Sequence, residues 1–168
     1  YLRRNFETNI IVYECSKEPI VSSLIKDDVT YIHQNIPDES FHRTRYLNRM
    51  LALSNTTVTV NYDADVILPI ESYLMAYKKI TRQNHDLVYP FAIGKFQKKV
   101  DASGREKLLN QSSVVELTPQ DYSECVAEYG YCQFFKTSSY KNYGWENENF
   151  ISYGPEDRER YDRFKKFN

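Results

Sequence analysis

The chain has 168 residues, of which 41% are hydrophobic and 27% charged, so it can fold as a single domain spanning residues 1–168. Its formal net charge of −1 provides no overall basic field, which argues against nucleic acid as a partner. The three cysteines form neither a CxxC pair nor a cluster with histidine, which argues against a disulfide framework and against structural zinc.

Targeting signals are also missing from the sequence. No apolar run is long enough to span a bilayer, and no signal peptide opens the chain, so we expect no transmembrane segment. Together with the odd cysteine count, this favours a cytoplasmic protein of bacterial type. Peripheral association with a membrane is the alternative, and the Golgi lumen is less favoured.

The first third of the chain predicts a helix tail, two strands and a helix. Residues 1–7 resemble the end of a helix, and the apolar runs at 9–14 and 31–34 predict strands. A helix is predicted from Phe41, entered through residues 37–40, where Asp38 or Ser40 can cap it. The apolar face of this helix is expected to consist of Thr44, Leu47, Met50, Leu51 and Ser54.

The remaining elements alternate between strands and helices. Strands are predicted at 56–62, 86–93 and 131–135, and helices at 69–82, 119–129 and 138–143, with a further helix beginning at Glu156. Residues 94–113 are polar and lack periodicity, which predicts a long loop that could act as a lid and become ordered when substrate binds. The alternation indicates an α/β fold with right-handed crossovers.

The most informative motif is a pair of aspartates after the third predicted strand. Asp63 and Asp65 directly follow the β-branched run at 56–62. Open α/β sheets bind ligands beyond the carboxyl ends of their strands, and in extended backbone residues two apart point to the same side. The pair can therefore share one divalent cation, which in turn can hold a diphosphate. The alternative is a plain strand-to-turn junction, where aspartate is common for backbone reasons.

A second acidic segment covers residues 144–160. Its Gly-Pro dipeptide at 154–155 marks a turn, and Glu156 and Asp157 then fall in the first turn of a helix. The helix dipole alone can account for acids at this position. The same dipole keeps a carboxylate ionised, which a general base requires. Tyr153, just before the turn, offers a ring face on which a sugar can stack.

Three segments of the chain occur in the order found in GT-A glycosyltransferases. They are residues 41–48 (Phe-His-Arg-Thr-Arg-Tyr-Leu-Asn), 62–69 (Tyr-Asp-Ala-Asp-Val-Ile-Leu-Pro) and 149–157 (Asn-Phe-Ile-Ser-Tyr-Gly-Pro-Glu-Asp). Over roughly residues 9–164 the chain resembles the β-1,4-galactosyltransferase-like group and the bacterial family-2 polysaccharide and capsule glycosyltransferases. The resemblance implies a GT-A (Rossmann-like) fold, with a mixed, mostly parallel sheet flanked by helices.

The resemblance also implies a donor site. Phe41 and Arg43 match positions that help to hold the nucleotide. Asp63 and Asp65 match the metal and nucleotide-sugar motif, with Asp65 as the main ligand of Mn²⁺ or Mg²⁺ and Asp63 nearer the ribose or sharing the ion. The expected donor is a nucleotide-diphosphate sugar, foremost a UDP-sugar.

On the acceptor side, the resemblance implies three further roles. Tyr153 matches an aromatic residue that stacks on a sugar, and Glu156 and Asp157 match the acidic pair at the acceptor site. Asp157 stands in the position of the catalytic base, and Glu156 is expected to orient the acceptor hydroxyls.

The chain departs from the group's pattern at three points. Pro155 replaces the usual second glycine, which restricts the backbone and removes an amide donor. The group's first strand would precede Tyr1, so we expect the sheet to lack that strand. The group's later histidine ligand would follow Asn168, and none of the three histidines falls at its position. We therefore expect either a fragment or a degenerate member of the group.

The implied activity is the transfer of a hexose (galactose, glucose or an N-acetylhexosamine) from the donor to a saccharide acceptor, with inversion and dependence on a divalent cation. One alternative enzyme is a sugar nucleotidyltransferase, which usually needs a glycine-rich, basic phosphate loop that this sequence does not show. The other alternative is a nucleotide- or saccharide-binding module that kept the fold without the chemistry.

Overall fold

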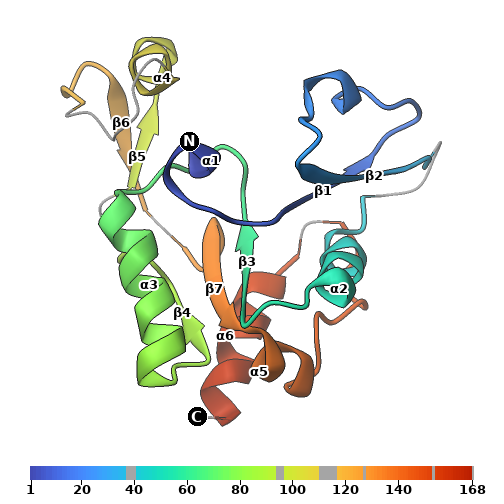
Figure 1. The fold of residues 1–168 in the computed structure, drawn as a ribbon. Coiled ribbons are helices and arrows are strands. Elements are labelled where there is room, and N and C mark those ends of the chain that lie inside the picture. The colour runs from blue at the N-terminus through green and yellow to red at the C-terminus, as the bar shows by residue number, and fades with distance from the viewer. Residues whose placement is uncertain (37–40, 94–96, 110–116, 127, 153, 168) are drawn as a thin grey trace.

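The computed structural model describes residues 1–36, 41–93, 97–109, 117–126, 128–152 and 154–167. The strands are β1 (Ile10–Cys15), β2 (Val29–Gln34), β3 (Val58–Tyr62), β4 (Leu87–Val88), β5 (Gln97–Val100), β6 (Tyr122–Cys125) and β7 (Cys132–Lys136). The helices are α1 (Leu2–Asn5), α2 (Arg43–Leu53), α3 (Ile70–Gln83), α4 (Ala102–Leu109), α5 (Thr137–Asn142) and α6 (Glu156–Phe167), with a 3-10 turn, η1, at Ser22–Leu24. This is a mixed α/β fold, as predicted (Figure 1).

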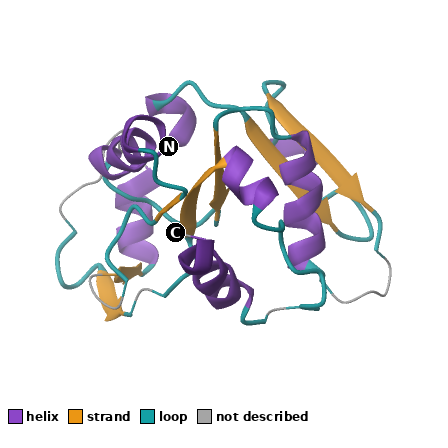
Figure 2. Ribbon diagram, turned by 90° about the horizontal axis from the view of Figure 1, so that it is seen from below, coloured by secondary structure: helices purple, strands orange, loops and turns teal. Residues whose placement is uncertain are grey.

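The strands form three small sheets rather than one large one. β1 and β2 pair in parallel, whereas β3–β7–β4 and β5–β6 are antiparallel. Figure 2 shows the two-stranded sheets on opposite sides of the central β3–β7–β4 sheet. The expected mostly parallel sheet is therefore wrong for the described residues. The side-chain pattern of a strand reports which faces are buried, but strand direction is set by the connections, which the pattern does not encode.

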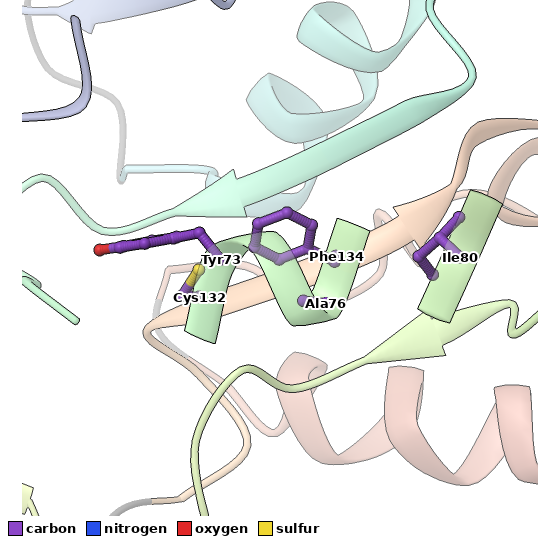
Figure 3. Close-up of a cluster of buried hydrophobic side chains, with 5 residues drawn as sticks. All are labelled: Tyr73, Ala76, Ile80, Cys132 and Phe134. Carbon is purple, nitrogen blue, oxygen red and sulfur yellow. The ribbon is translucent and has the colours of Figure 1, made fainter. Parts of the chain in front are cut away.

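Strand β7 lies at the middle of the central sheet and divides the core into two layers. Cys132 and Phe134 point toward α3, where they contact a cluster that includes Tyr73, Ala76 and Ile80 (Figure 3). Because alternate residues of a strand face opposite sides, Gln133 and Phe135 point toward α5 and α6. On that second side, a separate buried cluster consists of Leu51, Phe135, Tyr140 and Phe164. The sheet is thus covered on both faces.

The helices beside this sheet follow their sequence signals. α3 begins after Pro69, whose missing amide is harmless at a helix start, and it ends at Asn84 in the left-handed conformation (φ 60°). α5 ends before Gly144, which has φ 108° and so takes a conformation that favours glycine. α6 begins with acidic residues in its first turn, as predicted. The predicted cap of α2, at residues 37–40, lies outside the described residues.

Three sequence-based assignments are wrong. The expected lid loop at 94–113 contains β5 and α4, although residues 94–96 and 110–113 lie outside the described part of the chain. The expected helix at 119–129 contains the strand β6. The expected strand at 86–93 is reduced to β4, an edge strand that pairs with β7 at Leu87 and Val88 and ends before Pro90, which has no amide to donate.

β5, α4 and β6 form a unit of their own, here called the β5–α4–β6 unit, organised by the buried side chain of Asp121. Its carboxylate accepts hydrogen bonds from Lys107 at 2.6 and 2.7 Å, from the backbone and hydroxyl of Thr118 at 2.8 and 2.6 Å, and from Ser103 at 3.0 Å. A Cβ at Gly104 would lie only 2.5 Å from the Asp121 carbonyl oxygen, so only glycine lets α4 approach this closely. The sequence of α4 is only weakly amphipathic, so the helix depends on its contacts with Asp121 for stability.

Within the residues described, no helix has both the length and the apolar character needed to cross a membrane.

Candidate functional site

Asp63 continues one face of β3. Thr59 and Asn61 both hydrogen-bond side chains of α5, each at 2.8 Å, which fixes this row of the strand on the α5 and α6 side of the sheet. Asp63 is next in the row, and its backbone amide donates to the carbonyl of Tyr131 at 2.8 Å. The pairing of β3 with β7 thus directs Asp63 to the same side as the start of α6.

Immediately after Asp63 the chain turns. The Val66 amide donates to the Asp63 carbonyl at 3.0 Å, which closes a tight turn with Asp65 at its exposed corner. The expectation that residues 63–65 are extended is therefore wrong. The strand-to-turn interpretation describes the backbone correctly, although it does not by itself say what the two carboxylates bind.

Arg43 connects all three motifs. Its Nη2 lies 2.8 Å from Oδ1 of Asp63, and its Nε lies 3.8 Å from Oε1 of Glu156. Only 20% of the Arg43 side chain is exposed, because α2 places it between the end of β3 and the start of α6. Arg43 is thus held between two carboxylates that are distant in sequence.

Glu156 is buried at the first residue of α6. Its side chain is 4% exposed, and its Oε2 accepts a hydrogen bond from the Gly154 amide at 2.9 Å. This bond holds the turn that enters the helix, in the manner of a local cap. The predicted stacking residue Tyr153 is outside the described residues.

Asp157 has its two carboxylate oxygens in different environments. Oδ1 accepts hydrogen bonds from Arg160 at 2.6 Å and from Gln133 at 3.1 Å. Oδ2 faces Gly130, where an added Cβ would lie 2.9 Å away, and no described residue donates a hydrogen bond to it. One oxygen is thus fixed by Arg160 and Gln133, and the other accepts no hydrogen bond from the described residues.

The pKa values of the two aspartates shift in opposite directions. Burial raises the pKa of Asp63, and the nearby carboxylates of Asp157 and Asp65 add to this against the opposing charge of Arg43. Burial also acts to raise the pKa of Asp157, but the charge and hydrogen bond of Arg160 and the hydrogen bond of Gln133 outweigh it, so that pKa is lowered. Asp157 therefore stays ionised at neutral pH.

Arg160 is the main organiser of the site, and the sequence did not identify it. Its guanidinium is fully buried and makes two hydrogen bonds of 2.6 Å to the equally buried carboxylate of Glu146. It also donates to Gln133 at 2.8 Å. The Tyr140 hydroxyl donates to the same Glu146 carboxylate. Every buried charge in this network is paired, which buried ions require.

Asn48 fixes α2 to the segment that carries Glu146. The backbone amide of Glu146 donates to Oδ1 of Asn48 at 2.8 Å, and Nδ2 of Asn48 donates to the Glu146 carbonyl at 3.0 Å. One α2 turn earlier, the Thr44 hydroxyl donates to the Phe150 carbonyl at 3.1 Å. These bonds place Arg43, at the start of the same helix, against the acids of α6.

Phe41 contacts an aromatic group formed by α2 and β1. Its ring is 5.5 Å, centroid to centroid, from that of Tyr46, which stacks on Tyr13 of β1 at 5.2 Å. Arg49 donates to the Tyr13 hydroxyl at 2.6 Å, so an aromatic and basic surface borders β1 and β2. Phe41 and Arg43, both predicted nucleotide contacts, thus make different contacts in the fold, Phe41 with aromatic rings and Arg43 with carboxylates.

The residues expected to hold a cation form a partial donor set. Among the described residues, no group of three or more His, Cys, Asp or Glu side chains is placed to hold a metal ion. Asp65 is exposed, and Asp63 shares its Oδ1 with Arg43. Mg²⁺ is commonly bound by one or two carboxylates, with water and substrate phosphates completing the shell. The pair fits that kind of site and does not fit an all-protein cage.

The sequence held weak signals for the residues it missed. Asn48 belongs to the Leu-Asn part of the first motif, while Glu146 and Arg160 both fall in the acidic segment. The spacing of Arg160, three positions after Asp157, was the available clue, because residues three apart on a helix are neighbours.

No protein-family model matches the chain, and a search of curated proteins finds no match to it.

Proposed function

We propose that the chain is a glycosyltransferase that transfers a hexose from a nucleotide-diphosphate sugar to a saccharide acceptor, with inversion at the anomeric carbon. One observation carries the proposal. Arg43, Asp63, Glu156 and Asp157, predicted as site residues from three separate motifs, are brought together by the fold. A chain in which these residues had only local backbone roles would have no reason to place them side by side.

Asp157 is proposed as the base. Its Oδ2 would take the proton of an acceptor hydroxyl while the acceptor oxygen bonds to the anomeric carbon from the face opposite the leaving group. The bond from that carbon to the diphosphate oxygen breaks, and the diphosphate leaves with the electron pair. The lowered pKa makes Asp157 a weak base but keeps it ionised, which suits a hydroxyl that becomes acidic only as it attacks.

Arg43 and the aspartate pair are proposed to bind the donor. Asp65 is the freer carboxylate and is proposed as the main ligand of the cation, since Asp63 is already paired with Arg43. A bound Mg²⁺ or Mn²⁺ would neutralise charge on the leaving diphosphate. Glu156 would keep Arg43 in place when Asp63 turns toward a ligand.

Titration calorimetry with UDP, in the presence of manganese or of chelator, tests the donor site. Binding should require the cation and should weaken more for Asp65→Ala than for Asp63→Ala. Equal affinity with and without chelator would rule out the metal assignment. Binding of UDP and manganese without any sugar transfer would favour the non-catalytic module.

The transfer rate of Asp157→Asn tests the base. The amide oxygen can still accept from Arg160 and Gln133, so the fold and donor affinity should be kept, while the rate should fall by about a hundred- to ten-thousandfold. Glu156→Gln is the matched variant and should act mainly on donor affinity, because the buried Glu156 contacts Arg43 and the Gly154 amide rather than open space. An Asp157→Asn protein that transfers at the parental rate would remove the base from this residue.

A further inference from the structure

A cluster of five aromatic side chains borders the acidic site. Its members are Tyr89, Phe91, Tyr129, Tyr131 and Tyr161, here called the aromatic cluster, and each of them is only partly buried. Tyr129 and Tyr161 have ring centroids 4.6 Å apart, and Tyr89 lies 6.4 and 6.2 Å from them. Phe91 joins Tyr89 to Tyr131, at 5.8 and 6.1 Å. The cluster thus runs as a continuous surface from α6 to the end of β3.

The aromatic cluster and the acids share one short piece of backbone, residues 129–131. The Tyr131 carbonyl accepts the Asp63 amide, and Gly130 lies against Oδ2 of Asp157. Tyr131 has φ 66°, an uncommon conformation for a bulky residue and one often seen where a site imposes it. Tyr129 and Tyr131 therefore stand on either side of Gly130, which lies against Oδ2 of Asp157, the proposed base.

Helix α6 aligns the cluster with the base. Tyr161 follows Asp157 by four residues, so both lie on the same face of the helix. Arg158 lies at the rim, with its guanidinium carbon 4.9 Å from the Tyr129 ring centre and its Nη1 donating to the Tyr129 hydroxyl at 2.9 Å. Arg158 also pairs with Asp162 at 2.9 Å, so its own charge is balanced within the helix.

The cluster is not built like a closed core. The Tyr89 hydroxyl is buried, yet it has no hydrogen-bond partner among the described residues. A buried hydroxyl without a partner costs free energy, which a purely structural cluster has no reason to keep. The five rings are each only partly buried, and Tyr129 and Tyr131 flank Gly130, which lies against Oδ2 of Asp157. Aromatic faces next to a carboxylate suit a ligand that has both apolar faces and hydroxyl groups.

We propose that the aromatic cluster binds a neutral saccharide, the acceptor of the transfer, by stacking a sugar ring on Tyr129 and Tyr161 so that a hydroxyl faces Oδ2 of Asp157. This inference rests on the proposed function and names the acceptor side of the same site. It assigns acceptor binding to residues outside all three sequence motifs.

Glycan-array binding of the whole chain tests this proposal, with UDP and manganese affinity measured separately by calorimetry. The parent protein should bind a subset of neutral oligosaccharides. Tyr129→Ala and Tyr161→Ala should each weaken that binding by about tenfold, while Tyr129→Phe should stay close to the parent because it keeps the ring. UDP affinity should not change. The control is Tyr77→Ala, an exposed tyrosine on α3 that should have no effect.

Three results would overturn the proposal: no glycan bound by the parent, binding unchanged by both alanine variants, or a loss of UDP affinity that would assign the rings to the donor. Melting temperatures identify any variant that fails to fold. If Tyr161→Ala does so, Tyr129→Ala at the rim carries the test. Glycan binding that depends on the rings, without UDP binding, would keep the saccharide surface and reject the transferase.

Discussion

The centre of the molecule and the β5–α4–β6 unit are each organised by a buried carboxylate, but the cations paired with these carboxylates differ. At the centre, Glu146 and Arg160 are both fully buried, whereas Asp121 in the outer unit is paired with Lys107, which is 45% exposed. Arg160 also holds Asp157 and Gln133. The central ion pair is therefore part of the candidate site, while the outer pair holds only its own unit.

The two regions also differ in how far apart their partners are in sequence. Lys107 and Asp121 are separated by 14 residues and lie in one local unit, whereas Asp63, Arg43 and Asp157 come from three distant segments. A local unit can be lost without dismantling the rest of the fold. The centre cannot be lost in this way, because its charges are balanced by residues from distant segments of the chain.

The largest expected effect is at the centre. Arg160→Met should lower the free energy of unfolding by about 3–5 kcal/mol, because it leaves the Glu146 carboxylate buried without its cation. Urea denaturation measures this. The double variant Arg160→Met/Glu146→Leu should recover part of the loss, since the uncompensated charge is then gone.

Lys107→Met is the matched variant in the outer unit. It should lower the free energy of unfolding by less than Arg160→Met does, because Lys107 is half exposed and Asp121 keeps its hydrogen bonds to Thr118 and Ser103. An equal or larger loss at Lys107 would contradict the ranking of the two regions.

A smaller effect is expected from Gly104→Ala. Its Cβ would meet the Asp121 carbonyl, so the variant should lose about 1–3 kcal/mol, as overpacked sites do. Hydrogen exchange should show lost protection in β5 and β6 only, with UDP binding unchanged. Faster exchange in β3 and β7 would show that the two regions unfold together.

Gly130→Ala provides the contrast at the centre. The added Cβ meets a carboxylate side chain that can move, so stability should change little. Transfer should fall by up to about a hundredfold, because the proposed base is displaced. Full transfer activity in this variant would contradict the placement of Asp157.

The smallest effect is a pair of opposite pH dependences. The folded-state pKa of Asp63 is raised, so its contribution to stability is present below the unfolded pKa and is lost as the pH rises through the folded pKa. Asp63→Asn should therefore gain stability relative to the parent between about pH 3 and about pH 7.

The pKa of Asp157 is lowered, so its contribution is present above the unfolded pKa and is lost as the pH falls through the folded pKa. Asp157→Asn should therefore lose stability relative to the parent as the pH rises through the acid range up to about pH 4, where the unfolded carboxyl titrates, and the difference should stay constant above it. Thermal melts at several pH values measure both variants. Parallel curves for the two variants would contradict the assigned shifts.

Sequence patterns were sufficient to predict helices and strands where the local signals agreed with the tertiary structure. β3, β7, α3 and α6 were predicted because a β-branched run, the run with two Phe residues at 131–135, Pro69 and an acidic first turn mark them in that order. The β5–α4–β6 unit was missed because β5 is polar, and because the helix α4 contains a glycine that is needed only for its contact with Asp121. The pairing of Glu146 with Arg160 could not be predicted, because spacing along the chain does not show which charges become buried together.

The position of α6 in the chain has a consequence for biosynthesis. Every other described element precedes it, so a ribosome delivers Arg160 and Phe164 after the strands and helices that they contact. Until then the Glu146 carboxylate has no buried cation, and the layer around Phe135 lacks one of its rings. Docking of α6 completes the core and delivers Asp157 in the same event. In a nascent chain, Asp63, Glu156 and Asp157 therefore come together only when α6 packs against the rest of the fold.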